Sequence, residues 1–208
     1  MKELIGPKTK TAVFRVFDLF SVPLYMVTTS EKSQYAFFLI HKNGISSILS
    51  VLREETQREI DESYTIYHKS KYKNHFKFCF IRNPWDRLVS CYTNKVVRKQ
   101  LFPGCWGKDF AYFVDFVSHQ HLASSDKHIK LQTSQFPVKD IDYIARFENF
   151  ESEYNFIIND KLNLNREMVV KNKSNHRHYS EMYDDKTRRI VEQVYKADIE
   201  IGNYKFGK

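Results

Sequence analysis

Two short, nearly continuous apolar runs constrain the fold of this chain most. Residues 35–40 (YAFFLI) and 76–81 (FKFCFI) are rich in aromatic side chains, and each run is followed by a polar turn. Runs of this length without polar alternation are typical of strands covered on both faces in a parallel sheet. A third candidate strand spans 143–147. The pattern predicts an α/β fold with a central parallel sheet flanked by helices.

Helical patterns follow the first two runs. After the second run, Asn83 is expected to cap a helix that has Pro84 at its first position and Asp86 in its first turn. The apolar positions that indicate helices are Ile48, Leu49 and Leu52; Leu88, Tyr92 and Val96; Phe110, Phe113, Val114 and Val117; and, after a cap at Asp184 or Asp185, Ile190, Val191, Val194 and Tyr195.

Length and composition favour one domain. The chain has 208 residues with 42% hydrophobic content, enough for a sizeable core, and no repeat or linker interrupts it. We therefore expect a single domain over 1–208, with residues 1–34 as an N-terminal extension that packs on it. The net charge of +8 indicates an anionic partner. A nucleic acid, an acidic glycan and a nucleotide all satisfy that charge.

The cysteines and the N-terminal segment bear on location. Cys79, Cys91 and Cys105 are odd in number and lack CxxC spacing, so a disulfide framework, a zinc site or any other metal site is not indicated. The apolar stretch 12–27 is interrupted by Arg15 and Asp18, which fits neither a membrane span nor a signal peptide. We expect a cytoplasmic protein whose N-terminal segment lies on the domain, with peripheral membrane contact as the alternative.

The turn after the first predicted strand has the parts of an anion site. A strand that runs through a short turn into a helix directs backbone N–H groups and the positive end of the helix dipole at one point. In HKNGISS, Gly44 allows close backbone approach, Lys42 supplies a mobile cation, and the hydroxyls of Ser46 and Ser47 can donate to phosphate oxygens. The string is not a Walker A loop, and an ordinary capped turn is the alternative interpretation.

The turn after the second predicted strand carries a second anion-binding pair. In IRNPWDRLVSCY, Arg82 ends the strand and Ser90 lies two helical turns further on. A guanidinium and a hydroxyl converge on a phosphate monoester only if the strand end folds back along the start of the helix. Two such turns on adjacent strand–helix units predict a ligand with phosphates at two ends.

The paired motifs resemble those of a known family. LIHKNGISSIL and FKFCFIRNPWDRLVSCY are similar to the 5′-phosphosulfate and 3′-phosphate motifs of carbohydrate sulfotransferases and their bacterial relatives, and DKHIKLQ, DYIARFENFESEY, NKSNH and RIVEQVYKADIEIGNYKF follow in the family's order. The resemblance implies a P-loop-like sulfotransferase fold. It also implies transfer of a sulfuryl group from 3′-phosphoadenosine 5′-phosphosulfate (PAPS) to a hydroxyl of a carbohydrate or other small molecule, giving adenosine 3′,5′-bisphosphate (PAP), without a metal.

The resemblance also assigns residues. It implies that the 5′-phosphosulfate is held by Lys42, Gly44, Ile45, Ser46 and Ser47, that the 3′-phosphate is held by Arg82 and Ser90, and that Lys173 and Ser174 close over the nucleotide. His41 is a departure, because the family usually has proline before the lysine.

In-line sulfuryl transfer needs a cation at the leaving phosphate and a base at the acceptor hydroxyl. Lys42 is the candidate cation. The resemblance places the base between the two motifs, where His68 is preferred; His75, His41, Asp61 and Glu62 are the alternatives. His128 lies in a block that the family places near the acceptor, and a core histidine is its alternative interpretation. Glu148 is expected to have a structural role.

Two other functions remain as alternatives. A nucleotide-dependent phosphotransferase is disfavoured by the missing Walker A loop and the missing acidic pattern for Mg²⁺. A basic nucleic-acid-binding domain is disfavoured because the basic residues are dispersed among acidic ones and no nucleic-acid motif occurs, so nucleic acid is not the expected partner. The acceptor and the oligomeric state are not identified by the sequence.

Overall fold

A computed structural model describes residues 24–56, 64–168 and 178–208 and has one central sheet. The sheet order is β3-β1-β2-β4-β5. Strands β2, β4 and β5 are parallel neighbours, whereas β1 pairs antiparallel with both β2 and β3. The strands are β1 (Leu24–Ser30), β2 (Tyr35–Phe38), β3 (Tyr64–Ile66), β4 (Phe76–Ile81) and β5 (Tyr143–Arg146).

The expected α/β class with a parallel core is confirmed, and the sheet as a whole is mixed. All three predicted strands form, and they register Phe37 of β2 opposite Phe78 of β4, which in turn lies opposite Tyr143 of β5. The segment 24–30, which the sequence analysis assigned to an extension packed on the domain, forms strand β1. Its pairing of Val27 with Phe38 makes it part of the sheet.

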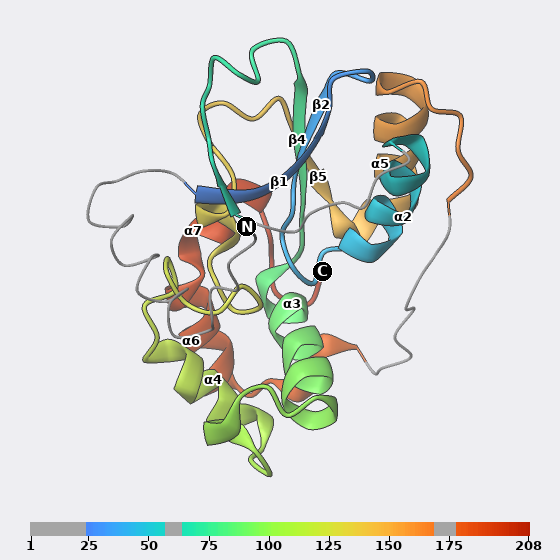
Figure 1. Ribbon diagram of the computed structural model, residues 1–208. Coiled ribbons are helices and arrows are strands. Elements are labelled where there is room, and N and C mark those ends of the chain that lie inside the picture. The colour runs from blue at the N-terminus through green and yellow to red at the C-terminus, as the bar shows by residue number, and fades with distance from the viewer. Residues whose placement is uncertain (1–23, 57–63, 169–177) are drawn as a thin grey trace.

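Helices cover both faces of the sheet, as Figure 1 shows, with α2 and α5 on one side and α3, α4, α6 and α7 on the other. The helices are α2 (Ile45–Thr56), α3 (Pro84–Cys91), α4 (Phe110–Ser118), α5 (Phe150–Tyr154), α6 (Asp185–Val194) and α7 (Lys196–Gly202). Helices α3 and α5 continue as the π-helical segments η1 (Tyr92–Arg98) and η5 (Asn155–Lys161). Short 3₁₀ turns are η2 (Pro103–Cys105), η3 (Gln132–Ser134), η4 (Phe147–Asn149) and η6 (Tyr179–Met182).

Alternating side chains of β2 and β4 supply two cores. Phe37 and Phe78 are stacked at 4.9 Å on the face toward α2 and α5, whereas Phe38 and Cys79 face the larger cluster with α3, α4 and α6. Because both faces of β2 and β4 pack against apolar cores, the sequences of these strands are continuously apolar and do not alternate between apolar and polar residues. The polar ends of these strands are therefore left to form the site.

The predicted helix ends are confirmed where the sequence has a capping residue. Asn83 accepts the N–H of Trp85 and precedes Pro84 at the start of α3. Asp184 and Thr187 form a reciprocal capping box at the start of α6. The predicted apolar face of α4 is buried: Phe110, Phe113, Val114 and Val117.

Candidate active site

The turn between β2 and α2 has an unusual backbone. Lys42 and Gly44 both have positive φ, 76° and 79°. A Cβ at Gly44 would lie 2.5 Å from the Phe150 ring and 3.2 Å from the Phe147 ring, so both the conformation and the packing require glycine. Helix α2 has no acidic residue in its first turn, so no carboxylate there opposes an anion at the positive end of the helix dipole.

Arg82 joins this turn to the one after β4. Its guanidinium donates to the Lys42 carbonyl through Nη1 at 3.0 Å and to Asp86 Oδ2 through Nε at 2.8 Å, and Nη2 lies 2.8 Å from the same Asp86 oxygen in an ion pair. The same group lies 4.4 Å from the centre of the Phe147 ring. Three of its five N–H groups are used in these bonds, so one on each terminal nitrogen is left for a ligand.

Buried amides fix the separation of the two turns. Asn43, 1% exposed, donates to the Phe80 carbonyl and to Gln132 Oε1, both at 2.7 Å. Gln132, with no exposed area, also exchanges two bonds of 2.9 Å with the backbone of Arg82. The backbone N–H of Gln132 donates to buried Asp198. Gln132 thereby ties both anion-binding turns to the C-terminal helix α7.

Arg87 brings a third segment to the same place. It is 2% exposed, and its guanidinium donates to the carbonyls of His41 at 3.1 Å, Lys130 at 2.9 Å and Lys127 at 3.3 Å. One buried cation therefore holds the loop 126–131 against the β2–α2 turn. Neither Arg87 nor Gln132 is among the site residues predicted from the sequence.

A pair of histidines lies where these two segments meet. The rings of His41 and His128 are perpendicular with centres 5.0 Å apart. His128 is 6% exposed, and its Nδ1 lies 2.7 Å from Asp126 Oδ1. The backbone N–H of His128 donates to the same carboxylate oxygen at 2.9 Å. His41 has a buried Nδ1 without a hydrogen-bond partner.

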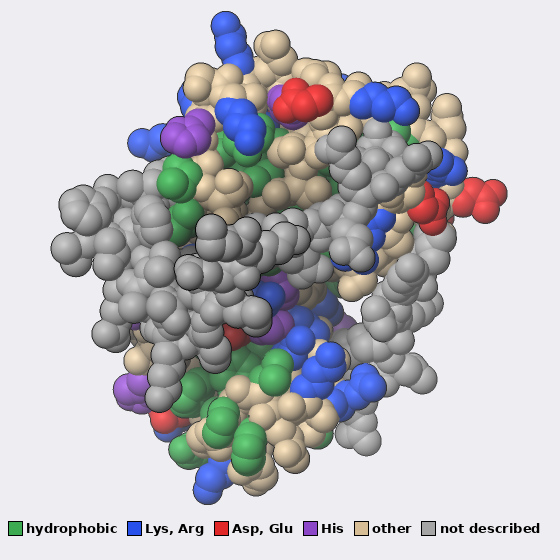
Figure 2. Space-filling view, viewed as in Figure 1, with side chains coloured by type: hydrophobic (Ala, Val, Ile, Leu, Met, Phe, Trp, Pro, Cys, Tyr) green, Lys and Arg blue, Asp and Glu red, His purple; other side chains and the backbone are tan. Residues whose placement is uncertain are grey.

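The charges around Lys42 favour an anion. Burial, together with the nearby cations Arg82, Lys95 and Arg87, lowers the pKa of Lys42 to about 8. Asp86, the carboxylate in the first turn of α3, is paired with Arg82. In Figure 2, Lys and Arg side chains gather over the region where Figure 1 places α3.

The predicted residues fall into three groups. The structure brings Lys42, Gly44 and Arg82 together, with Ile45, exposed Ser46 and buried Ser47 in the first turn of α2 and half-buried Ser90 in α3. Lys173 and Ser174, and the alternative bases Asp61 and Glu62, lie outside the described residues. His68 and His75 are described but lie elsewhere.

Contacts place His68 and His75 near the start of β4 rather than its end. His68 is exposed and lies between Tyr67 and Lys69, which both contact Asp140. Two residues later, Asp142 accepts the N–H of Lys77, the second residue of β4. His75 immediately precedes β4 and lies 3.4 Å from Glu31. At about 3.3 Å per residue, β4 separates this end from Arg82 by roughly 17 Å.

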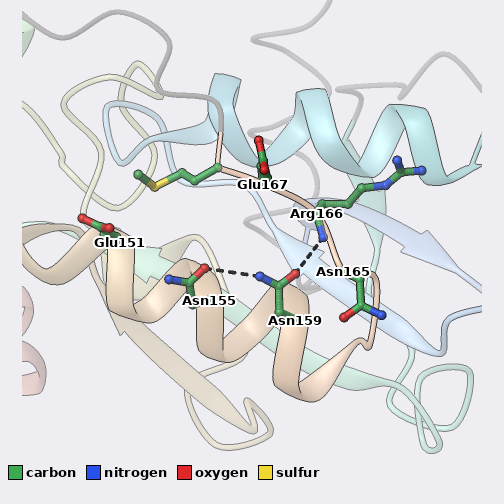
Figure 3. Close-up of a pocket in the computed structure, with 7 residues that line it drawn as sticks. Glu151, Asn155, Asn159, Asn165, Arg166 and Glu167 are labelled. Atoms are coloured by element: carbon green, nitrogen blue, oxygen red, sulfur yellow. Dashed lines mark hydrogen bonds between the residues drawn. The ribbon is translucent and has the colours of Figure 1, made fainter.

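The pocket drawn in Figure 3 is not part of this arrangement. It lies along α5 and η5, where Asn159 bonds Asn155 at 3.3 Å and the N–H of Arg166 at 2.8 Å. Its lining residues are Glu151, Asn155, Asn159, Asn165, Arg166, Glu167 and Met168, none of which is a predicted site residue.

Comparison with known protein families gives a match over most of the chain. The model of the sulfotransferase family matches residues 22–205. The chain belongs to the sulfotransferase family. Neither the curated proteins nor the solved structures gave a match. Enzymes of the family take the sulfuryl group from PAPS, and this sulfotransferase is accordingly a PAPS-dependent enzyme.

The chemistry of the site fits that donor. PAPS carries anionic groups at two ends of one adenosine, and the sulfotransferase offers two cationic turns at a separation fixed by buried amides. Among the described residues Lys42 has no carboxylate in an ion pair with it, and Arg82 keeps two N–H groups. Among the described residues, no cluster of His, Cys, Asp and Glu could hold a metal ion, and no helix is long and apolar enough to cross a membrane.

The RFEN block supports the site from behind. Glu148 accepts the Asn83 N–H at 2.6 Å and the Tyr204 hydroxyl at 3.1 Å, which confirms the expected structural role. Phe147 and Phe150 pack under Gly44. The sequence alone does not show that this block packs against both anion-binding turns; the folded structure does.

Proposed function

We propose that this sulfotransferase transfers the sulfuryl group of PAPS to a hydroxyl of a carbohydrate or another small molecule. In this proposal Lys42, Gly44, Ile45, Ser46 and Ser47 hold the phosphosulfate. Arg82 and Ser90 hold the 3′-phosphate, and Lys173 and Ser174 close over the nucleotide. The observation that carries the proposal is the buried clamp of Asn43 and Gln132, which sets two cationic turns at a fixed separation.

The chain's own groups would divide the work. PAPS, when bound, supplies the sulfuryl group and the leaving phosphate. The amides at the start of α2 and the hydroxyls of Ser46 and Ser47 orient phosphate oxygens, and the Lys42 ammonium stabilises the charge that develops there. Because these groups are prearranged by buried contacts, little reorganisation is needed during the reaction. The remaining group that the reaction needs is a base that accepts the proton of the acceptor hydroxyl.

The cysteines support a cytoplasmic location as part of this proposal. Cys79, Cys91 and Cys105 are all free and buried. Burial raises the pKa of each thiol, which keeps it protonated and unreactive. A reducing compartment suits three unpaired thiols in one small domain.

Binding of PAP in EDTA tests the proposal. At 100 times its Kd, PAP should stabilise the fold by about 2.7 kcal/mol, which for a chain of this size raises Tm by roughly 5–10 °C. Adenosine 5′-monophosphate, which lacks the 3′-phosphate, is the matched control and should give a much smaller shift.

Absence of any PAP shift, or a larger shift with a single-stranded oligonucleotide, would contradict the proposal and favour a nucleic-acid-binding domain. Incubation with ³⁵S-labelled PAPS and a panel of neutral and acidic oligosaccharides, phenols and simple alcohols then identifies the acceptor. We expect label to enter at least one hydroxyl compound without added metal.

A further inference from the structure

The residue that accepts the proton from the acceptor hydroxyl can be sought among the histidines near Lys42. The described residues place two there, His41 and His128, with ring centres 5.0 Å apart. Three carbonyl contacts of Arg87 fix their segments against each other. His68, by contrast, is exposed beside residues that contact Asp140, toward the start of β4.

The hydrogen bonds of His128 define which of its nitrogens can accept a proton. An ionised carboxylate only accepts hydrogen bonds, so the 2.7 Å contact with Asp126 requires the hydrogen on Nδ1. Nε2 then carries the free lone pair. Asp126 also accepts the backbone N–H of His128, and this second bond fixes the carboxylate relative to the ring.

Charge separates the two histidines. Burial and the nearby Lys127, Arg87 and Lys95 lower the pKa of His41 to about 2, so it is a weak proton acceptor. Burial also lowers the pKa of His128, helped by Lys95 and Lys127, but the Asp126 hydrogen bond and charge oppose that shift. An imidazolium formed at His128 would have the Asp126 carboxylate as partner, whereas one formed at His41 would lie near the cations Lys127, Arg87 and Lys95.

We propose that His128, oriented by Asp126, is the general base that takes the proton from the acceptor hydroxyl. The inference rests on the proposed function. The acceptor oxygen forms a bond to sulfur with its own electron pair, its proton passes to His128 Nε2, and the bond from sulfur to the phosphate oxygen breaks with its electrons remaining on PAP. His128 is the catalytic residue and Asp126 a positioning residue. Lys42 keeps the role that the proposed function gives it, stabilisation of charge on the leaving oxygen.

Three variants test this assignment with labelled PAPS and the acceptor found in the panel. His128→Ala should lower turnover roughly 10²- to 10⁴-fold, leave the Kd for PAP within about twofold, and remove the acidic limb of the pH–rate profile. Asp126→Asn should lower turnover less and move that limb to lower pH, because the carboxylate raises the pKa of His128. His68→Ala is the matched control and should change neither quantity.

A wild-type measurement covers the case in which His128→Ala does not fold. ¹⁵N NMR of the histidine side chains should show His128 as the Nδ1–H tautomer at pH 7.5, with Nε2 unprotonated. An Nε2–H tautomer would overturn the proposal, as would normal turnover by His128→Ala. Loss of turnover in His68→Ala with retention in His128→Ala would assign the base to His68. None of these results affects PAP binding, which tests the proposed function separately.

Discussion

The two anion-binding turns differ in how their cations are held. Arg82 is 6% exposed and already engages a carboxylate, a carbonyl and an aromatic ring. Lys42 follows an equivalent strand, and among the described residues it forms no ion pair with a carboxylate; burial is the main cause that lowers its pKa to about 8. The protein fixes the Arg82 guanidinium, whereas the Lys42 ammonium is available to a ligand. The comparison separates a group suited to positioning from one suited to stabilising new charge.

Backbone conformation follows the same division. Lys42 adopts φ of 76°, a strained conformation for a lysine. Its carbonyl is held in that conformation by the Arg82 guanidinium at 3.0 Å. Asn83, after Arg82, has a negative φ of −46° and caps α3 by accepting the Trp85 N–H. The Arg82 turn therefore supports the Lys42 turn, and removal of either cation should give a different kind of defect.

The largest expected effect is that of Lys42→Ala on turnover. If the ammonium stabilises charge on the leaving phosphate, its loss should lower turnover roughly 10²- to 10³-fold, with a smaller loss of PAP affinity. Single-turnover transfer from labelled PAPS measures the first quantity and calorimetry with PAP the second. Lys186→Ala, at an exposed position of α6, is the control. Equal losses in affinity and turnover would make Lys42 a binding group only.

Local sequence signals predicted the parts of the site that depend on local structure. The strand–turn–helix units and the caps at Asn83 and Asp184 are each decided within a few residues, and the structure confirms them. Strand β1 was assigned differently because its residues alternate between buried and half-buried and follow an apolar stretch. Its register is set by β2 and β3, which the local pattern does not reveal.

Long-range buried contacts account for what the sequence did not reveal. Gln132 forms hydrogen bonds with Arg82, which is 50 positions away in the sequence, and with Asp198, which is 66 positions away. Arg87 donates to the His41 carbonyl, 46 positions away. In a single sequence each resembles an ordinary surface polar residue. Burial makes them informative, because a buried polar group without a partner costs about 1–3 kcal/mol. The block DKHIKLQ was singled out by resemblance, but its contacts required the fold.

The next effect is that of Arg82→Ala on stability. The Arg82 and Asp86 side chains are 7% and 17% exposed, so the substitution leaves a largely buried carboxylate unpaired and should cost about 3 kcal/mol of unfolding free energy. Urea unfolding measures this. Lys196→Ala, which removes a pair whose side chains are 75% and 65% exposed, is the control and should cost less than about 1 kcal/mol. If Arg82→Ala left the urea midpoint unchanged, the Arg82 guanidinium would not be a structural cation, and the proposed difference from Lys42 would be wrong.

The smallest effect is the pH dependence of PAP binding. A phosphate beside Lys42 should raise its pKa above the value of about 8 in the free protein, so binding above pH 8 requires proton uptake. Below pH 8 the lysine is already charged and affinity should be flat with respect to this group. Above it, the Kd for PAP should rise by up to about tenfold per pH unit until the pKa of the complex is reached. Phosphate ionisation is complete by pH 7.5, since its second pKa is about 6.

Calorimetry between pH 7.5 and 9.5 measures the slope of the Kd for PAP against pH, and Lys42→Met should abolish this slope. Arg82 stays charged throughout this range, so a slope that survives in Lys42→Met would mean that another lysine, such as Lys95, is the group that takes up the proton.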